Sequence, residues 1–288
     1  MMRGLTVSLV NINQAQLTMN LLDQLARLSA EDWAVQLIWV DNGSRDDQVR
    51  QLSAWFLANK ERFAEARFVA VSRNLGANGG RNIALNAASH DMILILDNDI
   101  ILPDDAAWLG TLWRRMEDDP QIGIAGPVLV SAAYPDIVES TGIGLTDRGR
   151  VGYLNRAQPA AYISPTLVEV VAIPSACWLV RREAQQTVGL LSDEYYPMQY
   201  EDVDFCVRLT LAGWKIVCDR GVRVKHIGNV TTRNLEGQPY TRVAVRHGII
   251  FREKWADILP QIATISEDDI YWGPIPRIDK GSATAHEV

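Results

Sequence analysis

The sequence has few cysteines, no excess of positive charge and no long apolar run. Its three cysteines, Cys177, Cys206 and Cys218, are too sparse for a disulfide framework and lack metal-site spacing, which indicates a reducing compartment. The net charge of −7 argues against the concentrated basic surface of a nucleic-acid-binding protein. No segment approaches the roughly 20 apolar residues of a transmembrane helix, and the start lacks a signal-peptide pattern. We therefore expect a cytoplasmic protein, and leave open whether it contacts the inner face of a membrane.

Short apolar strands alternate with helices over the first hundred residues. The 288 residues, 48% of them apolar, can form one large domain or two small ones. We expect helices at 15–28 and 48–60, a short one ending near 88, and strands at 5–10, 35–40, 67–71 and 92–96. This alternation predicts an α/β protein with a mostly parallel, Rossmann-like sheet and helices on both faces.

The pattern changes after residue 102. The segment 134–162 is rich in Gly, Thr and Arg and predicts short antiparallel pieces, the smaller second region of the fold. Further expectations are a strand at 216–218, a turn at 224–228, a last helix at 243–255 and an extended, partly disordered tail from residue 259. We thus predict one domain over 1–258, with halves at 1–102 and 103–258, and a tail over 259–288.

The apolar run 92–96 ends in Asp97 and Asp99. Side chains two apart on an extended backbone point the same way, so both carboxylates can converge on one spot. In an open α/β sheet that spot lies at the carboxyl edge, where ligands bind. Paired oxygen ligands suit Mg²⁺ or Mn²⁺ held together with substrate phosphates. The alternative is a loop of solvated acids that follows a strand.

Other polar turns follow the neighbouring strands. Asn11 and Asn13 follow the first strand, Asp41 follows the second, and the glycine-rich stretch 74–82, which includes Arg81, follows the third. Because the carboxyl ends of parallel strands share one edge, we expect these turns to meet. Asp41 either bonds a nucleoside or forms a turn before a glycine. The glycine-rich stretch either binds an anion at a helix start or is a plain structural loop.

The second half carries a smaller set of candidates. Glu201 and Asp202 begin a predicted helix, where the helix dipole alone explains acids, although a carboxylate there can also act as a general base. Asp204 continues this acidic turn. His226 is either a metal or phosphate contact or a structural histidine. Arg246 either reaches a diphosphate or belongs to a solvated helix face.

Seven segments, in this order over residues 5–255, carry a resemblance to a known family. They are VSLVNIN (7–13), VDNGS (40–44), NLGANGGRN (74–82), LDND (96–99), SACWLVRRE (175–183), VGLLSDE (188–194) and YEDVDFCVRL (200–209). Together they resemble glycosyltransferase family 2 with the GT-A fold, and within it bacterial rhamnosyltransferase-like members. Each segment alone is a weak motif, so the order makes the resemblance specific.

The resemblance implies a nucleotide-sugar donor and a divalent cation, Mn²⁺ or Mg²⁺. It implies that Asp99 is the more direct metal ligand, that Asp97 lies nearer the ribose and also serves the metal, and that His226 is a further contact. It implies a catalytic base in the pair Glu201 and Asp202, of which we favour Asp202. The donor-binding residues expected on this basis are Asn11, Asn13, Asp41, Asn74, Gly76, Arg81, Asp97 and Asn98.

The expected reaction is inverting transfer of a sugar from a UDP- or dTDP-sugar, with GDP-sugars not excluded, to a hydroxyl of a saccharide or lipid-linked acceptor. Alternatives are a retaining transferase, a nucleotidyltransferase, or a protein that binds a nucleotide sugar without turnover. The sequence departs from the family pattern at three places. Ile12 leaves base stacking on the first segment open, and Ser175 and the stretch 191–194 are places where the acceptor shape can differ while the chemistry is kept. The sequence does not define the oligomeric state.

Overall fold

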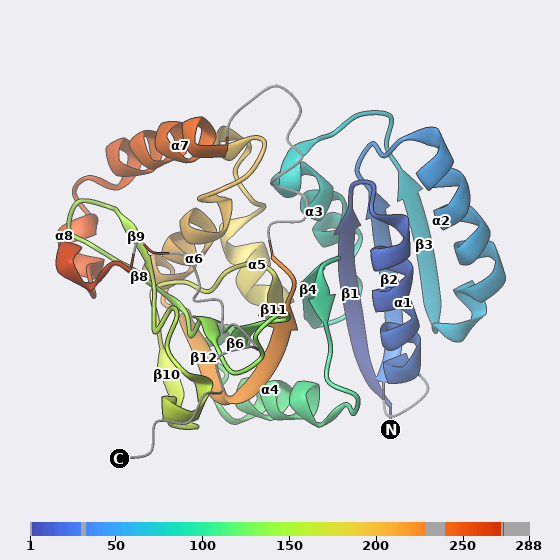
Figure 1. Cartoon of the computed structure of the whole chain (residues 1–288), viewed down its shortest axis with the longest axis horizontal. Coiled ribbons are helices and arrows are strands. Elements are labelled where there is room, and N and C mark those ends of the chain that lie inside the picture. Colours follow the sequence, from blue (N-terminus) through green and yellow to red (C-terminus); the bar gives the residue numbers. More distant parts are fainter. Residues whose placement is uncertain (1, 30–32, 229–239, 272, 274–288) are drawn as a thin grey trace, which may run out of the picture.

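The computed structural model describes residues 2–29, 33–228, 240–271 and 273 (Figure 1). Its strands are β1 (Arg3–Asn11), β2 (Trp33–Asp41), β3 (Glu65–Ala70), β4 (Met92–Asp97), β5 (Ile100–Ile101), β6 (Ile122–Ser131), β7 (Val138–Ser140), β8 (Ile143–Leu145), β9 (Val151–Tyr153), β10 (Leu167–Glu169), β11 (Cys177–Arg181) and β12 (Lys215–His226). In this part of the chain they form one ten-stranded sheet and a two-stranded sheet of β8 and β9.

The large sheet has the order β10-β12-β6-β11-β4-β1-β2-β3, with β5 beside β12 and β7 beside β6. Strands β3, β2, β1 and β4 run parallel. Strand β11 is antiparallel to both β4 and β6, so β6 and its parallel neighbour β12 run in the same direction as β4. The prediction of a mostly parallel α/β sheet with a small antiparallel region is confirmed.

Helices cover both faces of the sheet. They are α1 (Ala15–Ser29), α2 (Asp46–Asn59), α3 (Gly76–Ala87), α4 (Ala107–Asp118), α5 (Arg182–Val188), α6 (Glu201–Leu211), α7 (Tyr240–Trp255) and α8 (Leu259–Ile262). Residues of α1, α2 and α4 share one apolar core, and residues of α5, α6 and the end of α3 share the other. Strand β4 therefore has both faces buried, which explains its uninterrupted apolar run.

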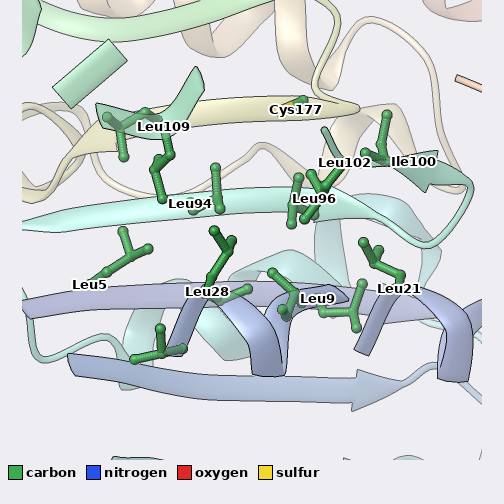
Figure 2. Close-up of a cluster of buried hydrophobic side chains, with 14 of the residues drawn as sticks. Leu5, Leu9, Leu21, Leu28, Leu94, Leu96, Ile100, Leu102, Leu109 and Cys177 are labelled. Atoms are coloured by element: carbon green, nitrogen blue, oxygen red, sulfur yellow. The ribbon is translucent and has the colours of Figure 1, made fainter. Parts of the chain in front are cut away.

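Figure 2 shows one of these cores at the level of side chains. Leu94 and Leu96 of β4 lie among Leu5 and Leu9 of β1 and Leu21 of α1. The intervening Ile93 and Ile95 belong to the core on the opposite face. This alternation places the backbone of β4 at the centre of the molecule, with its carboxyl end at Asp97.

Two segments ahead of the tail differ from the sequence expectation. The helix expected after residue 82 already begins at Gly76, so most of the glycine-rich stretch is helical. The strand expected at 216–218 and residues 224–226 of the expected turn belong to one twelve-residue strand, β12, with a register irregularity between Asp219 and Arg223. Pairing of β12 with β6 and β5 satisfies the backbone groups of the expected turn.

The predicted tail is folded as far as residue 271. Helix α8 and a 3₁₀ turn at Glu267–Asp269 follow α7, and Leu259 and Ile270 are buried. The amide of Thr264 donates to the carbonyl of Leu145 in β8 at 2.9 Å. The expectation of an extended tail is therefore wrong for 259–271, while 272 and 274–288 lie outside the described residues. The two predicted halves of the domain stay a prediction.

None of the helices in the described ranges is long and apolar enough to cross a membrane.

Candidate active site

A cavity of about 310 Å³ opens at the carboxyl ends of β1 and β4. Residues from α3, α6, β7, β9 and the start of α7 complete its wall. The sequence-predicted residues in this wall are Asn11, Asn74, Arg81, Asp97, Asn98, Asp99, Glu201, Asp202 and His226. Three others, Asn13, Asp41 and Gly76, are outside the lining set. Most of the predicted site thus gathers around one cavity, as the shared sheet edge requires.

Asp41 is fully buried behind the cavity wall. Its register partner on β1, Asn11, donates to its Oδ2 at 2.8 Å, and the amide of Ser44 donates to its Oδ1 at 3.0 Å. Asn11 also accepts a hydrogen bond from the indole of Trp39 at 2.6 Å. Asn13 accepts one from the Arg45 amide at 3.0 Å. Asp41 and Asn13 therefore order these turns, and their contact with a nucleoside stays a prediction.

Asn42 connects the turn after β2 to the start of α3. Its side chain donates to the carbonyl of Gly76 at 2.9 Å and accepts from the amide of Leu75 at 2.9 Å, while Asn74 accepts from the Gly76 amide at 2.8 Å. Gly76 has φ +78°, and a Cβ there would lie 2.7 Å from the carbonyl oxygen of Pro197. Gly76 thus permits a close backbone approach that a larger residue would prevent.

Asp97, Asn98 and Asp99 form the turn between β4 and β5. The Asp97 amide donates to the carbonyl of Ala176, and Asn98 donates to the hydroxyl of Thr18, each at 3.0 Å. These bonds fix the turn against β11 and α1. Asn98 and Asp99 are both buried, whereas the Asp97 side chain is 34% exposed and so remains open to a ligand.

Arg81 links this turn to α6. Its guanidinium lies 2.5 Å from Oδ1 of Asp97 and 3.1 Å from Oε1 of Glu201. Burial alone would lower the pKa of Arg81, but the two carboxylates raise it, so the residue is a permanent cation. Burial and the charge of Asp202 raise the pKa of Glu201 to about 7, and its Oε2 has no hydrogen-bond partner in the described structure.

Asp202 has a different environment. Its Oδ1 accepts from the Val203 amide at 2.8 Å, and its Oδ2 accepts from the Ser175 amide at 3.4 Å. None of the ion pairs recorded for the described residues includes Asp202. Burial raises its pKa. Among the described residues the carboxylate thus has two backbone amides and no cation as direct partners, a raised basicity and a place in the cavity wall, which are properties of a general base.

Asp204, two residues further on, has a structural role. It is fully buried and accepts from Arg208 at 2.9 Å, from Tyr195 at 3.2 Å and from the indole of Trp255 at 3.0 Å. The sequence prediction that it only continues an acidic first turn is therefore incomplete. Asp204 ties α6 to the end of α7.

His226 is the last residue of β12 and lies between two carboxylates. Its Nε2 is 3.3 Å from Oδ1 of Asp99, and its Nδ1 is 2.7 Å from Oε2 of Glu139. Strand register creates this arrangement, since His226 pairs with Ile100, the residue after Asp99. Burial lowers the pKa of His226, but the bonds to Asp99 and Glu139 outweigh it and raise the pKa to about 10.

Asp99 and His226 form a donor set that fits a divalent cation. A cation bound at Nε2 would replace the proton there, so that one oxygen and one nitrogen donor stand side by side, while Glu139 orients the ring through Nδ1, as outer carboxylates do in metal sites. Mg²⁺ uses one or two protein carboxylates and completes its shell with water and substrate phosphates, and Mn²⁺ accepts the same ligands. Arg81 occupies one oxygen of Asp97. Within the described ranges, no three His, Cys, Asp or Glu side chains form a metal cluster.

Sequence reasoning missed several residues of the cavity wall. Glu139, Tyr153 and Arg156 come from the segment that was expected to form short antiparallel pieces, and Tyr240 begins α7. Nothing in the sequence connects Glu139 with His226, because the two meet only through the pairing of β7 and β12 with β6. Asn42 was visible as part of a polar turn, although its bonds to α3 were not.

A mostly parallel sheet with carboxylates around a cavity at its carboxyl edge defines an α/β enzyme site. Comparison with known families specifies this class further. The sequence model of glycosyl transferase family 2 matches residues 7–187, more than half of the chain, so the chain belongs to glycosyl transferase family 2.

Two curated proteins are similar to this chain. An uncharacterized protein, y4gI, of Sinorhizobium fredii is 23% identical over 229 residues, which are 76% of this chain and 24% of that protein. The O-antigen biosynthesis protein RfbC of Myxococcus xanthus is 27% identical over 159 residues, 53% of this chain and 12% of that protein. The matched regions are thus a quarter or less of the length of these relatives.

Solved structures share the fold at low identity. GalNAc-T7 with UDP, GalNAc and Mn²⁺ aligns with a TM-score of 0.65 at 15% identity, over 90% of this chain and 50% of that one. The mannosyltransferase PcManGT of Pyrobaculum calidifontis with GDP-Man and Mn²⁺ gives 0.55 at 14%, over 90% and 71%. TarS of S. aureus with UDP-GlcNAc gives 0.58 at 14%, over 93% and 69%. The chain is a glycosyltransferase domain of the GT-A fold.

Proposed function

We propose that the protein transfers a sugar from a nucleotide-diphosphate donor to a hydroxyl of a saccharide or lipid-linked acceptor, with inversion at the anomeric carbon and dependence on Mn²⁺ or Mg²⁺. The fold neighbours with UDP, UDP-GlcNAc or GDP-Man support a nucleotide-sugar donor, and two of them hold Mn²⁺. UDP- and dTDP-sugars are the favoured donors and GDP-sugars the alternative. The similarity to an O-antigen biosynthesis protein supports a saccharide acceptor.

The environment of Asp202 carries this proposal. Of the two acids that begin α6, Glu201 is bound to Arg81, whereas Asp202 accepts two backbone hydrogen bonds and no others from the described residues. An inverting transfer needs one carboxylate free to take a proton, and Asp202 meets that requirement in the cavity wall. A retaining transferase would leave this residue without a chemical task.

The donor half of the site has a separate task. Asp99 and His226 would hold the cation, which when bound supplies Lewis-acid stabilisation of the leaving diphosphate. Arg81 fixes one oxygen of Asp97, so that the remaining oxygen can accept a hydrogen bond from the donor ribose. The buried Asn98 holds the turn in place through Thr18.

The proton and electron pairs balance in one displacement. The acceptor oxygen forms a bond to the anomeric carbon as Asp202 takes its proton. The bond from that carbon to the diphosphate oxygen breaks with both electrons on the leaving nucleoside diphosphate. The transition state resembles an oxocarbenium ion, as in glycosidases.

A donor screen followed by product analysis tests the proposal. The protein is incubated with UDP-, dTDP- and GDP-sugars, with Mn²⁺ or EDTA, and release of the nucleoside diphosphate is measured. We expect release from one donor class that EDTA abolishes. The anomeric coupling constant of the product by proton NMR then gives the stereochemistry: inversion agrees with the role of Asp202, and retention refutes it.

A further inference from the structure

Arg156 differs from the other cations of the cavity. Arg81 is bound by Asp97 and Glu201, and His226 lies between two carboxylates. For Arg156 the described structure records no carboxylate contact: Nη1 lies 3.4 Å from the carbonyl oxygen of Glu139, and Cζ lies 5.4 Å from the ring centre of Tyr153. Arg156 is thus the cavity cation whose charge the described residues leave uncompensated.

Most hydrogen-bond donors of the Arg156 guanidinium are unused in the described structure. The guanidinium carries five N–H groups in a planar fork that matches a carboxylate or a phosphate. One long bond to a carbonyl and a contact with an aromatic face use little of this capacity, and a partly buried cation gains most from an anionic partner. The chemistry of Arg156 therefore favours an anionic ligand in the cavity.

The turn that carries Arg156 is well anchored. The hydroxyl of Thr141 donates to Asn155 at 2.7 Å, and the amide of Ala157 donates to the carbonyl of Val138 at 2.9 Å. The Leu154 amide donates to the carbonyl of Gly142, also at 2.9 Å. A side chain on such a support loses less conformational freedom when it binds a ligand, so its contribution to affinity is larger.

Arg156 lines the same cavity as the proposed base, Asp202. Burial raises the pKa of Tyr153, the charge of Asp202 raises it further, and Arg156 lowers it. The same two charges act in the same directions on Tyr240. Glu201 also raises the pKa of both phenols. Arg156, the two rings and both acids that begin α6 line the same cavity. The predicted donor residues lie on β1, β2, β4 and α3 and in the turns that follow the parallel strands.

We propose that Arg156 binds an anionic group of the acceptor, a phosphate or a carboxylate, so that the enzyme selects acidic acceptors. This inference rests on the proposed function, because it requires that an acceptor hydroxyl enters beside Asp202. The diphosphate of the donor is a second source of the same chemistry, and the experiment has to distinguish the two.

Binding measurements separate these sources. The nucleoside diphosphate that binds with Mn²⁺ is first titrated into wild type, Arg156→Gln and Arg148→Gln, an exposed arginine of a neighbouring turn that serves as control. At saturating nucleotide and Mn²⁺, each protein is then titrated with glucose 1-phosphate, glucuronate and glucose. We expect the two anions to bind wild type at least tenfold more tightly than glucose, and Arg156→Gln to lose about tenfold of this preference while its nucleotide Kd is unchanged.

Other outcomes overturn the inference. Equal binding of the anions and glucose by wild type, or an unchanged preference in Arg156→Gln, shows that Arg156 does not select an acidic acceptor. A weaker nucleotide Kd in Arg156→Gln assigns the residue to the donor diphosphate. If no nucleoside diphosphate binds wild type in the presence of Mn²⁺, the proposed function itself fails and the inference fails with it.

Discussion

Arg81 and Glu201 form a buried ion pair, 3.1 Å between Nη1 and Oε1, that joins α3 to the first turn of α6. Both side chains are about 5% exposed. Arg81 also binds Asp97, so a single cation sets the position of the end of β4 relative to the helix that carries Asp202. The end of β4 and the start of α6 are thus connected through one guanidinium.

Burial of Glu201 beside Asp202 makes stability depend on pH, because both raise the pKa of Glu201 more than Arg81 lowers it. The pKa of Glu201 is raised from 4.5 to about 7, so the folded protein binds more protons at this group than the unfolded chain between these values. Stability from protonated Glu201 is fully present below pH 4.5 and is lost as the pH rises to 7. Over this pH range we expect the free energy of unfolding of wild type to fall by roughly 1 to 3 kcal/mol relative to that of Glu201→Gln. Urea unfolding of both proteins at pH 4.5, 6 and 7.5 measures the difference, and parallel curves would contradict it.

Asp202→Asn should reduce kcat by roughly 10²–10⁴-fold, because the amide cannot take the acceptor proton. Affinity for the nucleoside diphosphate should be unchanged, since we propose that this ligand is held by Asp99 and His226 and not by Asp202. Glu201→Gln keeps a hydrogen-bond acceptor for Arg81 and should lose much less activity. Rates across pH add a second readout: the acidic limb of the wild-type profile should disappear in Asp202→Asn. Equal rates for wild type and Asp202→Asn would show that Asp202 is not the catalytic base.

The strands, the helices and the carboxyl-edge cluster of acids were predictable because each depends on local pattern. The apolar run of β4, the polar residues after it and the parallel direction of β1, β2 and β4 place Asp97 and Asp99 beside Asn11 without long-range information. The same reasoning placed Asp202 at a helix start.

What the sequence did not reveal depends on long-range register and burial. Glu139 reaches His226 because β7 and β12 both pair with β6, and neither pairing has a local signal. Asp204 follows Asp202 in the same acidic turn, yet the helix turns it inward to Arg208 while Asp202 faces the cavity. Arg156 has no distinguishing sequence context. We single it out because, in the described structure, it lines the cavity without a carboxylate contact.

Glu139 should control metal affinity although it is not proposed as a ligand. It accepts or shares the proton at Nδ1 of His226, which leaves Nε2 directed at Asp99. Replacing such an outer carboxylate weakens metal binding by about 10–100-fold. We therefore expect Glu139→Ala to need about 10–100-fold more Mn²⁺ for half-maximal stabilisation by the nucleoside diphosphate in a thermal-shift titration.

The control is Asp136→Ala, which removes an exposed carboxylate from the same segment. It should need as much Mn²⁺ as wild type, and Asp99→Ala should lose the Mn²⁺-dependent shift. If Glu139→Ala responds to Mn²⁺ like wild type, Glu139 does not contribute to metal affinity.

His247 should fix the loop of residues 197–199, which forms part of the cavity wall. It is fully buried in α7, and its Nδ1 lies 2.8 Å from the carbonyl oxygen of Met198, a cavity residue. Its Nε2 lies 2.9 Å from a donor nitrogen of Arg246, so the consistent assignment is a neutral ring with the proton on Nδ1. Burial lowers the pKa of His247, which agrees with that state.

His247→Ala leaves the Met198 carbonyl without this donor and should lower the free energy of unfolding by roughly 1–3 kcal/mol. Because the loop then loses its attachment to α7, we also expect a lower kcat/KM. Val245→Ala, on the same helix but 59% exposed, should stay within about 0.5 kcal/mol of wild type. Urea unfolding and steady-state kinetics of the three proteins test this. If His247→Ala loses stability and keeps full kcat/KM, the loop keeps its shape without α7, and the position of Met198 in the cavity is then set by its own backbone turns.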